Sequence, residues 1–176
     1  MSLNFFSAAP RPADERERQR AVDASGILRA PANPALHAIV AAGAELFGAP
    51  MAALSIVDRD RQWFAARVGL DAPETSRAVS FCAHAILSPT EALVVPDAAL
   101  DDRFAGNPLV QSQPGIRFYA GVPIIGLNGQ PLGALCVIDR SPRNGVLPLE
   151  ELAELAARAG RAIAEMSGPA RPGGGR

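Results

Sequence analysis

Residues 115–139 decide the class of fold, and they read GIRFYAGVPIIGLNGQPLGALCVID. Two apolar runs, Ile116–Ile125 and Leu132–Asp139, flank the dipeptide Asn128-Gly129 in this stretch. Asn-Gly between apolar runs is the strongest short-range signal of a β-hairpin, because both residues tolerate the positive φ angles of a tight turn. We therefore predict two antiparallel strands here, and with them an antiparallel sheet.

The sequence on either side of this hairpin predicts a mixture of helices and strands. Asn33-Pro34, for example, is a typical helix start, with a capping side chain followed by proline. Residues 69–78 and 97–115 are predicted to be irregular. The second stretch is expected to contain at most one short helix, around Arg103 and Phe104. Apolar patterns predict strands over 51–58, 61–68 and 93–95, and helices over 13–25, 34–47, 80–87 and 148–166. The combination indicates an α+β fold, with a central antiparallel sheet and helices on its faces.

The chain is expected to form one domain with two tails. Its 176 residues suit a single domain, and a hydrophobic content of 48% supports a packed core. We expect a flexible N-terminal tail over residues 1–12 and a disordered Gly/Pro/Arg-rich tail over 168–176. The single domain then covers residues 13–167, with its core in 27–166.

The composition excludes several classes of function. The formal net charge is -1, so the chain lacks the basic excess of a nucleic-acid-binding protein. All 17 basic residues are arginine, so no lysine can form a Schiff base or bind phosphate in a P-loop. No apolar run reaches the roughly 18 residues of a transmembrane helix, and the N-terminus lacks the charged region of a signal peptide. We expect a cytoplasmic protein with neither a membrane nor a nucleic-acid partner.

Eight short motifs follow one another in the order found in one known family. The motifs are ELFGAP (45–50), SIVDRDRQWF (55–64), SFCAHAI (80–86), VPD (95–97), DRF (102–104), NPL (107–109), GIRFYAGVP (115–123) and LGALCVID (132–139). Together they resemble the GAF domains, which are small-molecule sensor modules of bacterial signalling proteins and phosphodiesterases. This version is similar to the bacterial subgroup found ahead of histidine kinases and diguanylate cyclases.

The resemblance implies a GAF-like sheet with two different faces. It implies about five or six strands, with the terminal helices on one face and a ligand pocket on the other. The helix at 80–87 and the excursion at 97–115 would roof this pocket. The resemblance also implies a homodimer through the terminal helices. Because no kinase, cyclase or phosphodiesterase follows residue 166, we expect a free-standing GAF domain.

These expectations favour a binding module over an enzyme. We expect a sensory, signal-transducing domain that binds an unidentified small molecule. It would act as a homodimer on a separate protein, with a histidine kinase or cyclase as a candidate partner. No complete catalytic constellation is found, and no cofactor or metal is assigned. Two alternatives remain open: a thiol-dependent reductase similar to the free methionine sulfoxide reductases, and a degenerate domain that only dimerises.

Ten residues are candidates for the lining of the pocket. Strand alternation places Trp63 and Phe64 on opposite faces, and Trp63 is preferred because its indole N–H suits a half-wet site. Arg103 and Arg117 can bind an anionic ligand, or form surface ion pairs with nearby aspartates. The candidates are Trp63, Phe81, Cys82, His84, Asp97, Arg103, Phe104, Arg117, Tyr119 and Cys136.

The two cysteines, Cys82 and Cys136, allow several kinds of chemistry. On a helix, Cys82 and His84 point about 200° apart, so they cannot chelate one metal ion. Attachment of a bilin pigment, as in phytochrome-like GAF domains, needs Cys followed directly by His, and Ala83 intervenes. A two-thiol redox cycle needs one cysteine of low pKa near the other, whereas the simpler interpretation buries both in the core. Cyclic-nucleotide-binding GAF domains use a lysine that this chain lacks.

Overall fold

The computed structural model describes residues 5–167 and contains a six-stranded antiparallel sheet, in the order β3-β2-β1-β6-β5-β4. The strands are β1 (Met51–Asp58), β2 (Arg61–Val68), β3 (Glu74–Ser76), β4 (Leu93–Val95), β5 (Phe118–Ile125) and β6 (Pro131–Asp139). The long helices are α1 (Glu15–Ser25), α2 (Pro34–Phe47) and α5 (Leu149–Met166), and the short ones are α3 (Cys82–Ala85) and α4 (Pro108–Gln111). This architecture confirms the predicted α+β class and the strand number.

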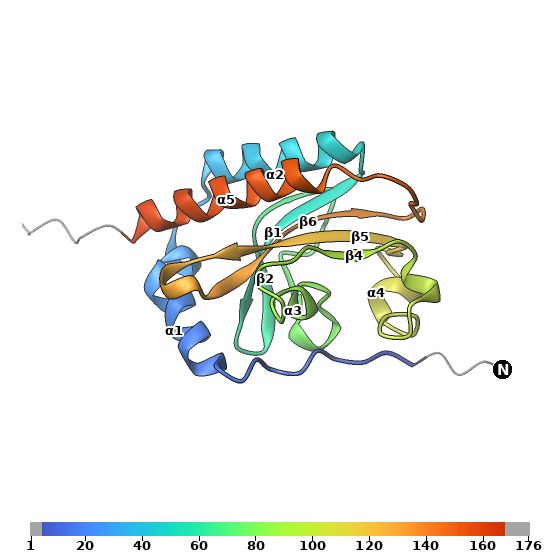
Figure 1. Cartoon of the computed structure of the whole chain (residues 1–176), viewed down its shortest axis with the longest axis horizontal. Helices are drawn as coiled ribbons and strands as arrows, with labels where there is room; N and C mark the ends of the chain where they lie inside the picture. The colour runs from blue at the N-terminus through green and yellow to red at the C-terminus, as the bar shows by residue number, and fades with distance from the viewer. Residues whose placement is uncertain (1–4, 168–176) are drawn as a thin grey trace, which may run out of the picture.

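Helices cover both faces of the sheet (Figure 1). The helices α2 and α5 lie side by side along one face, whereas α3 and α4 lie against the other. Successive residues of β5 and β6 alternate between these layers. Phe118 and Leu135 pack under α2 and α5, while Tyr119 and Cys136 belong to a second apolar cluster under α3. The sheet therefore separates the core under α2 and α5 from the layer under α3, which contains the candidate site.

The predicted hairpin is formed by β5 and β6. The two strands pair from Phe118 opposite Asp139 to Ile125 opposite Pro131. In the connecting loop, Asn128 and Gly129 have φ angles of 60° and 73°. These angles are the reason that Asn-Gly is favoured here, since most residues avoid positive φ.

Capping explains where the helical segments begin. In α2, the Asn33 side chain accepts a hydrogen bond from the backbone N–H of Ala35 at 2.8 Å, and Gly48 ends the helix in the left-handed conformation. Asn107 caps α4 in the same way, accepting from the N–H of Leu109 at 2.9 Å.

The prediction of a short helix around Arg103 and Phe104 is wrong. The helical pieces of the excursion are a 3₁₀ turn at Ala98–Leu100 and α4. The Asp101 carboxylate accepts a hydrogen bond from the backbone N–H of Arg103, which holds a turn in place of a helix. The segment 69–78, expected to be irregular, also contains the short strand β3.

The N-terminal segment that precedes α1 runs extended beneath α3 and α4 (Figure 1). Ser7 donates its N–H to the carbonyl of Arg103 at 3.0 Å, and Gly106 donates to the carbonyl of Phe5 at 2.9 Å. The Nε2 atom of His84 lies 3.0 Å from the carbonyl oxygen of Ser7. These contacts connect the segment to α3 and to the turn at 101–107.

The predicted C-terminal tail, residues 168–176, lies outside the described residues. Within residues 5–167, every helix is too short or too polar to span a bilayer.

Candidate functional site

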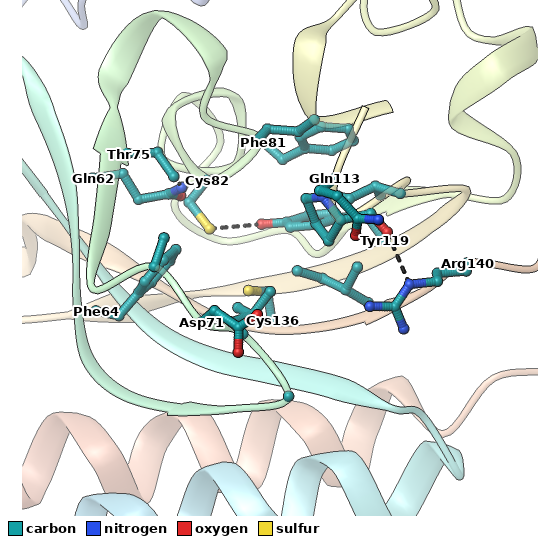
Figure 2. Close-up of a pocket in the computed structure, with 17 residues that line it drawn as sticks. Gln62, Phe64, Asp71, Thr75, Phe81, Cys82, Gln113, Tyr119, Cys136 and Arg140 are labelled. Atoms are coloured by element: carbon teal, nitrogen blue, oxygen red, sulfur yellow. Dashed lines mark hydrogen bonds between the residues drawn. The ribbon is translucent and has the colours of Figure 1, made fainter. Parts of the chain in front are cut away.

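A cavity of about 210 Å³ lies between the sheet and α3. Figure 2 shows how its side chains converge from β2, α3, β5 and β6. Its lining comprises Gln62, Phe64, Gly69, Leu70, Asp71, Ala72, Thr75, Phe81, Cys82, Leu109, Gln113, Pro114, Ile116, Tyr119, Cys136, Ile138 and Arg140. The position on the sheet face opposite α2 and α5 makes this cavity the candidate functional site.

The cavity combines apolar walls with a polar rim. Phe64, Leu70 and Ile138 contribute apolar walls, whereas Asp71 and Arg140 are exposed at the edge. The Arg140 guanidinium is held by a hydrogen bond from its Nε to the carbonyl of Pro114 at 2.9 Å (Figure 2). Within residues 5–167, neither Asp71 nor Arg140 has an ion-pair partner. The rim therefore presents both charge signs to a ligand.

Two free thiols line the wall of the cavity. Cys82 projects from α3 and Cys136 from β6, and both are buried. The Cys82 sulfur lies 3.1 Å from the Tyr119 hydroxyl (Figure 2). Hydrogen bonds from Cys136 and Tyr119 lower the pKa of the Cys82 thiol, although burial opposes them. The pKa of Cys136 is raised, because its interaction with Cys82 and its burial favour the neutral thiol.

A buried polar network positions α3 above the sheet. The Ser80 hydroxyl accepts a hydrogen bond from the N–H of Ala83 at 3.0 Å, and it donates to the side-chain Oε1 of Gln62 at 2.7 Å. The same Gln62 oxygen accepts from the Ser55 hydroxyl at 3.0 Å. Phe81 then stacks on Phe104, with ring centres 4.0 Å apart. These contacts hold α3 at a defined distance from the sheet, above the two thiols.

Comparison with known families identifies the fold to which this site belongs. A family model of the GAF domain matches residues 32–164. The chain belongs to the GAF domain family. This membership confirms the resemblance that the sequence motifs carry.

Relatives of this GAF domain include a phosphodiesterase and several solved domains. A cyclic di-GMP phosphodiesterase of Pseudomonas aeruginosa is 49% identical over 146 residues, which make up 83% of this chain and 24% of that protein. The GAF domain thus spans about a quarter of that relative.

Solved structures share the fold at low sequence identity. The GAF domain of an Acinetobacter phosphoenolpyruvate-protein phosphotransferase has a TM-score of 0.59 and 18% identity, covering 85% of this chain and 92% of that chain. A free methionine-R-sulfoxide reductase of Neisseria meningitidis, solved in complex with its substrate, has a TM-score of 0.58 and 19% identity, covering 95% and 98%. At these identities the likeness shows the fold alone.

Four of the ten residues predicted for the pocket line the cavity of this GAF domain. They are Phe81, Cys82, Tyr119 and Cys136. They come together because α3 crosses above β5 and β6, and because odd-numbered Tyr119 and even-numbered Cys136 point toward the same face. Strand alternation separates Tyr119 from Phe118, and the preference for a ring with a polar group selects Tyr119 correctly. The position of both thiols on one cavity depends on where α3 docks.

Trp63 lies on the opposite face of the sheet from the cavity, which corrects the sequence prediction. It lies opposite Ile56 on the neighbouring strand and packs against the core under α2 and α5. Phe64 pairs with Ser55 and lines the cavity in its place. Alternation separated the two rings correctly, but the preference for a polar ring chose the wrong one.

The other five predicted residues also lie outside the cavity lining. Arg117 forms a two-pronged ion pair with Asp97, both contacts at 2.7 Å, at the edge of the sheet. Arg103 pairs with Asp101 at 2.7 Å, and its guanidinium lies over the Phe104 ring. Phe104 is buried behind Phe81, and His84 faces the N-terminal segment. Local ion pairing therefore removes both arginines from the site.

Sequence reasoning missed the polar rim. Asp71, Gln113 and Arg140 lie in connecting segments, where no periodic pattern predicts which side chains converge. Arg140 directly follows the last residue of β6, and this position at a strand end is the one sequence signal that it could lie at the rim of the cavity. In residues 5–167, no group of three or more His, Cys, Asp or Glu side chains is arranged to hold a metal ion.

Proposed function

We propose that this GAF domain is a sensory module that binds a small molecule in the cavity beneath α3. One observation carries the proposal: an apolar cavity with charged rim residues lies on the sheet face that the terminal helices leave free. Pockets for drug-sized ligands have volumes of roughly 300–1,000 Å³. A volume of about 210 Å³ therefore suits a smaller ligand.

The lining favours a ligand with an apolar body and a polar or charged end. Phe64, Leu70 and Ile138 would surround the body. The end would reach Asp71 or Arg140 at the rim, where neither charge is neutralised by a partner among residues 5–167. Burial of the body supplies affinity, while the rim contacts orient the ligand.

We further propose that the module acts as a cytoplasmic homodimer on a signalling enzyme. The identity of 49% with part of a cyclic di-GMP phosphodiesterase supports an enzyme of cyclic di-GMP turnover as the partner. The helices α1 and α5 are the elements available to transmit a change, because they lie away from the cavity and end near one another.

Native mass spectrometry of protein purified from its own cells tests the binding proposal. We expect a mass excess that disappears on denaturation, which would give the mass of a non-covalent ligand. An excess that survives denaturation would indicate covalent attachment at Cys82 or Cys136. Protein without any excess would instead favour the domain that only dimerises.

Filling the cavity tests where that ligand binds. Leu70→Phe should reduce the ligand-bearing fraction several-fold, because the larger ring occupies the cavity wall beside Phe64. Leu100→Phe is the matched control, since Leu100 is 81% exposed and outside the lining. Equal ligand occupancy in both variants would place the ligand elsewhere.

Thiol-dependent reduction is a second candidate function, favoured by the position of Cys82 and Cys136 on one cavity wall. The fold shared with a free methionine sulfoxide reductase is compatible with it. The test is turnover of free methionine sulfoxide with a thiol reductant. Full activity in Cys82→Ser would exclude this function.

A further inference from the structure

The cavity brings together every sulfhydryl group of the chain, because Cys82 and Cys136 both line it. They come from α3 and β6, and the two cysteines are more than fifty residues apart in the sequence. Figure 2 shows both sulfur atoms on the cavity side of their elements, with the Tyr119 hydroxyl beside Cys82. Two thiols placed in this way can react with each other as well as with a small molecule.

The cavity gives a small reagent access to these buried thiols. Cys82 and Cys136 are 2% and 1% exposed at the molecular surface, so a bulky reagent cannot reach them from outside. The rim residues Asp71, Gln113 and Arg140 are exposed, however, so the cavity opens to solvent. Its volume of about 210 Å³ is several times the roughly 30 Å³ that one water molecule occupies. Hydrogen peroxide is little larger than water and fits easily.

The two thiols are prepared for different roles. Cys82 has the lowered pKa, because its interactions with Cys136 and with the Tyr119 hydroxyl, which lies 3.1 Å from its sulfur, favour the thiolate. Burial keeps Tyr119 protonated by raising its pKa, so its O–H remains available as a donor. Cys136 has the raised pKa and remains a neutral thiol. The first step of an oxidation needs a thiolate, and the second needs a neighbouring thiol.

We propose that Cys82 and Cys136 form an oxidisable dithiol, which a small peroxide converts into an intramolecular disulfide. The Cys82 thiolate attacks one peroxide oxygen, the O–O bond breaks, and the departing hydroxide takes a proton to form water. The Cys136 sulfur then attacks the sulfur of the Cys82 sulfenic acid, forming the S–S bond and releasing a second water. Two thiols and one hydrogen peroxide thus give one disulfide and two waters. The disulfide would tie α3 to β6 across the wall of the cavity.

Intact-mass analysis of the reduced full-length chain after treatment with hydrogen peroxide tests this proposal. We expect a mass loss of two hydrogens, loss of both thiols to a maleimide after denaturation, and recovery of both with a reductant. Non-reducing electrophoresis should show a monomer, because the bond is intramolecular. The Cys82→Ser/Cys136→Ser double variant is the control. It has no thiols, so any change in its mass after peroxide treatment comes from methionine oxidation, which adds oxygen rather than removing hydrogen.

Single variants separate the roles of the two thiols. In Cys136→Ser, dimedone should trap a sulfenic acid on Cys82, because no thiol remains to resolve it. In Cys82→Ser, trapping at Cys136 should be many-fold lower. Tyr119→Phe should slow the reaction of Cys82 several-fold, since one hydrogen-bond donor to its sulfur is lost. Circular dichroism and the unfolding midpoint of each variant show whether it is folded.

Two outcomes would overturn the proposal. The first is wild-type protein that keeps both thiols at peroxide concentrations that oxidise free cysteine. The second is equal trapping at the remaining thiol in folded Cys82→Ser and folded Cys136→Ser, which would mean that the thiols are not differentiated. Neither outcome depends on ligand binding, so the proposed sensory function is tested separately.

Discussion

Gly121 leaves the space that Tyr119 needs beneath the roof of the cavity. A Cβ atom at position 121 would lie 2.2 Å from the Tyr119 hydroxyl oxygen and 2.6 Å from the ring carbon that bears it. Tyr119 is buried and its ring packs beside Phe81, so a side chain at position 121 would displace the ring from this packing. The absence of a side chain at Gly121 of β5 therefore allows the Tyr119 ring to lie beside Cys82.

We predict that Gly121→Ala lowers the free energy of unfolding by about 1–3 kcal/mol, the usual cost of overpacking a core. The displaced ring should also lose its hydrogen bond with Cys82. Chemical denaturation measures the first effect, and the rate of peroxide oxidation at Cys82 measures the second.

Gly43→Ala is the matched control for this substitution. The nearest atoms to a Cβ at this position of α2 lie at an ordinary 3.7 Å. Because alanine is a better helix former than glycine, this variant should be as stable as the wild type or more stable by up to about 1 kcal/mol. Equal stability of the two alanine variants would refute the packing role of Gly121.

At the scale of elements, buried charges hold α1 against the sheet. Arg18 is fully buried, and its Nη1 donates to the carbonyl of Pro131 at the start of β6 at 3.2 Å. Glu15 pairs with both Arg18 and Arg77. Arg77 also donates to the carbonyl of Arg59 in the β1–β2 turn at 2.9 Å. This network links α1 to the segment that leads into α3.

We predict that Glu15→Gln destabilises the protein by about 2 kcal/mol at neutral pH, because it leaves the buried Arg18 charge uncompensated. Burial alone would raise the pKa of Glu15, but hydrogen bonds from Arg18 and Arg77 outweigh it and lower the pKa from 4.5 to about 2. The stabilisation is therefore complete above about pH 4.5 and is lost as the pH falls toward 2.

Urea unfolding at pH 7 and near pH 2 checks this prediction. The difference between Glu15→Gln and the wild type should be large at pH 7 and should shrink in acid. Glu17→Gln, at an exposed position of the same helix, serves as the control and should follow the wild type. A constant difference at both pH values would contradict the role of the Glu15 carboxylate.

At the scale of the whole molecule, one apolar groove lies on the flank of α5. Small residues of the helix, including Ala157 and Gly160, line it together with Ile125 and Leu127 from the end of β5 and the following loop. Ile125 is 39% exposed and Leu127 is 52% exposed. Small side chains permit close approach of a second helix, which makes this groove our candidate for the homodimer contact.

We predict that Ala157→Glu shifts the protein from dimer to monomer, because it places a charge in this groove. Arg158→Glu adds the same side chain at an exposed position about 100° around the helix, outside the groove. It should therefore remain dimeric. Light scattering after size-exclusion chromatography measures the mass, and a monomeric wild-type protein would exclude the homodimer.

The sequence by itself determined the elements whose causes are local. The Asn128-Gly129 turn, the Asn33 cap and the alternation along β5 each act over a few neighbouring residues, and the structure matches the expectations for all three. The start of α4 at Asn107-Pro108 has the same Asn-Pro pattern as the start of α2, so this helix also has a local signal in the sequence.

Only the tertiary structure decided which side chains share the cavity. The pairing of β2 with β1 places Phe64 on the cavity face and Trp63 on the opposite face. Arg117 lies outside the cavity, where it pairs with Asp97. The position of Cys82 and Cys136 on one cavity wall depends on how α3 docks on the sheet. Such contacts join residues that are distant along the chain, and they are governed by packing and desolvation rather than by local conformational preference.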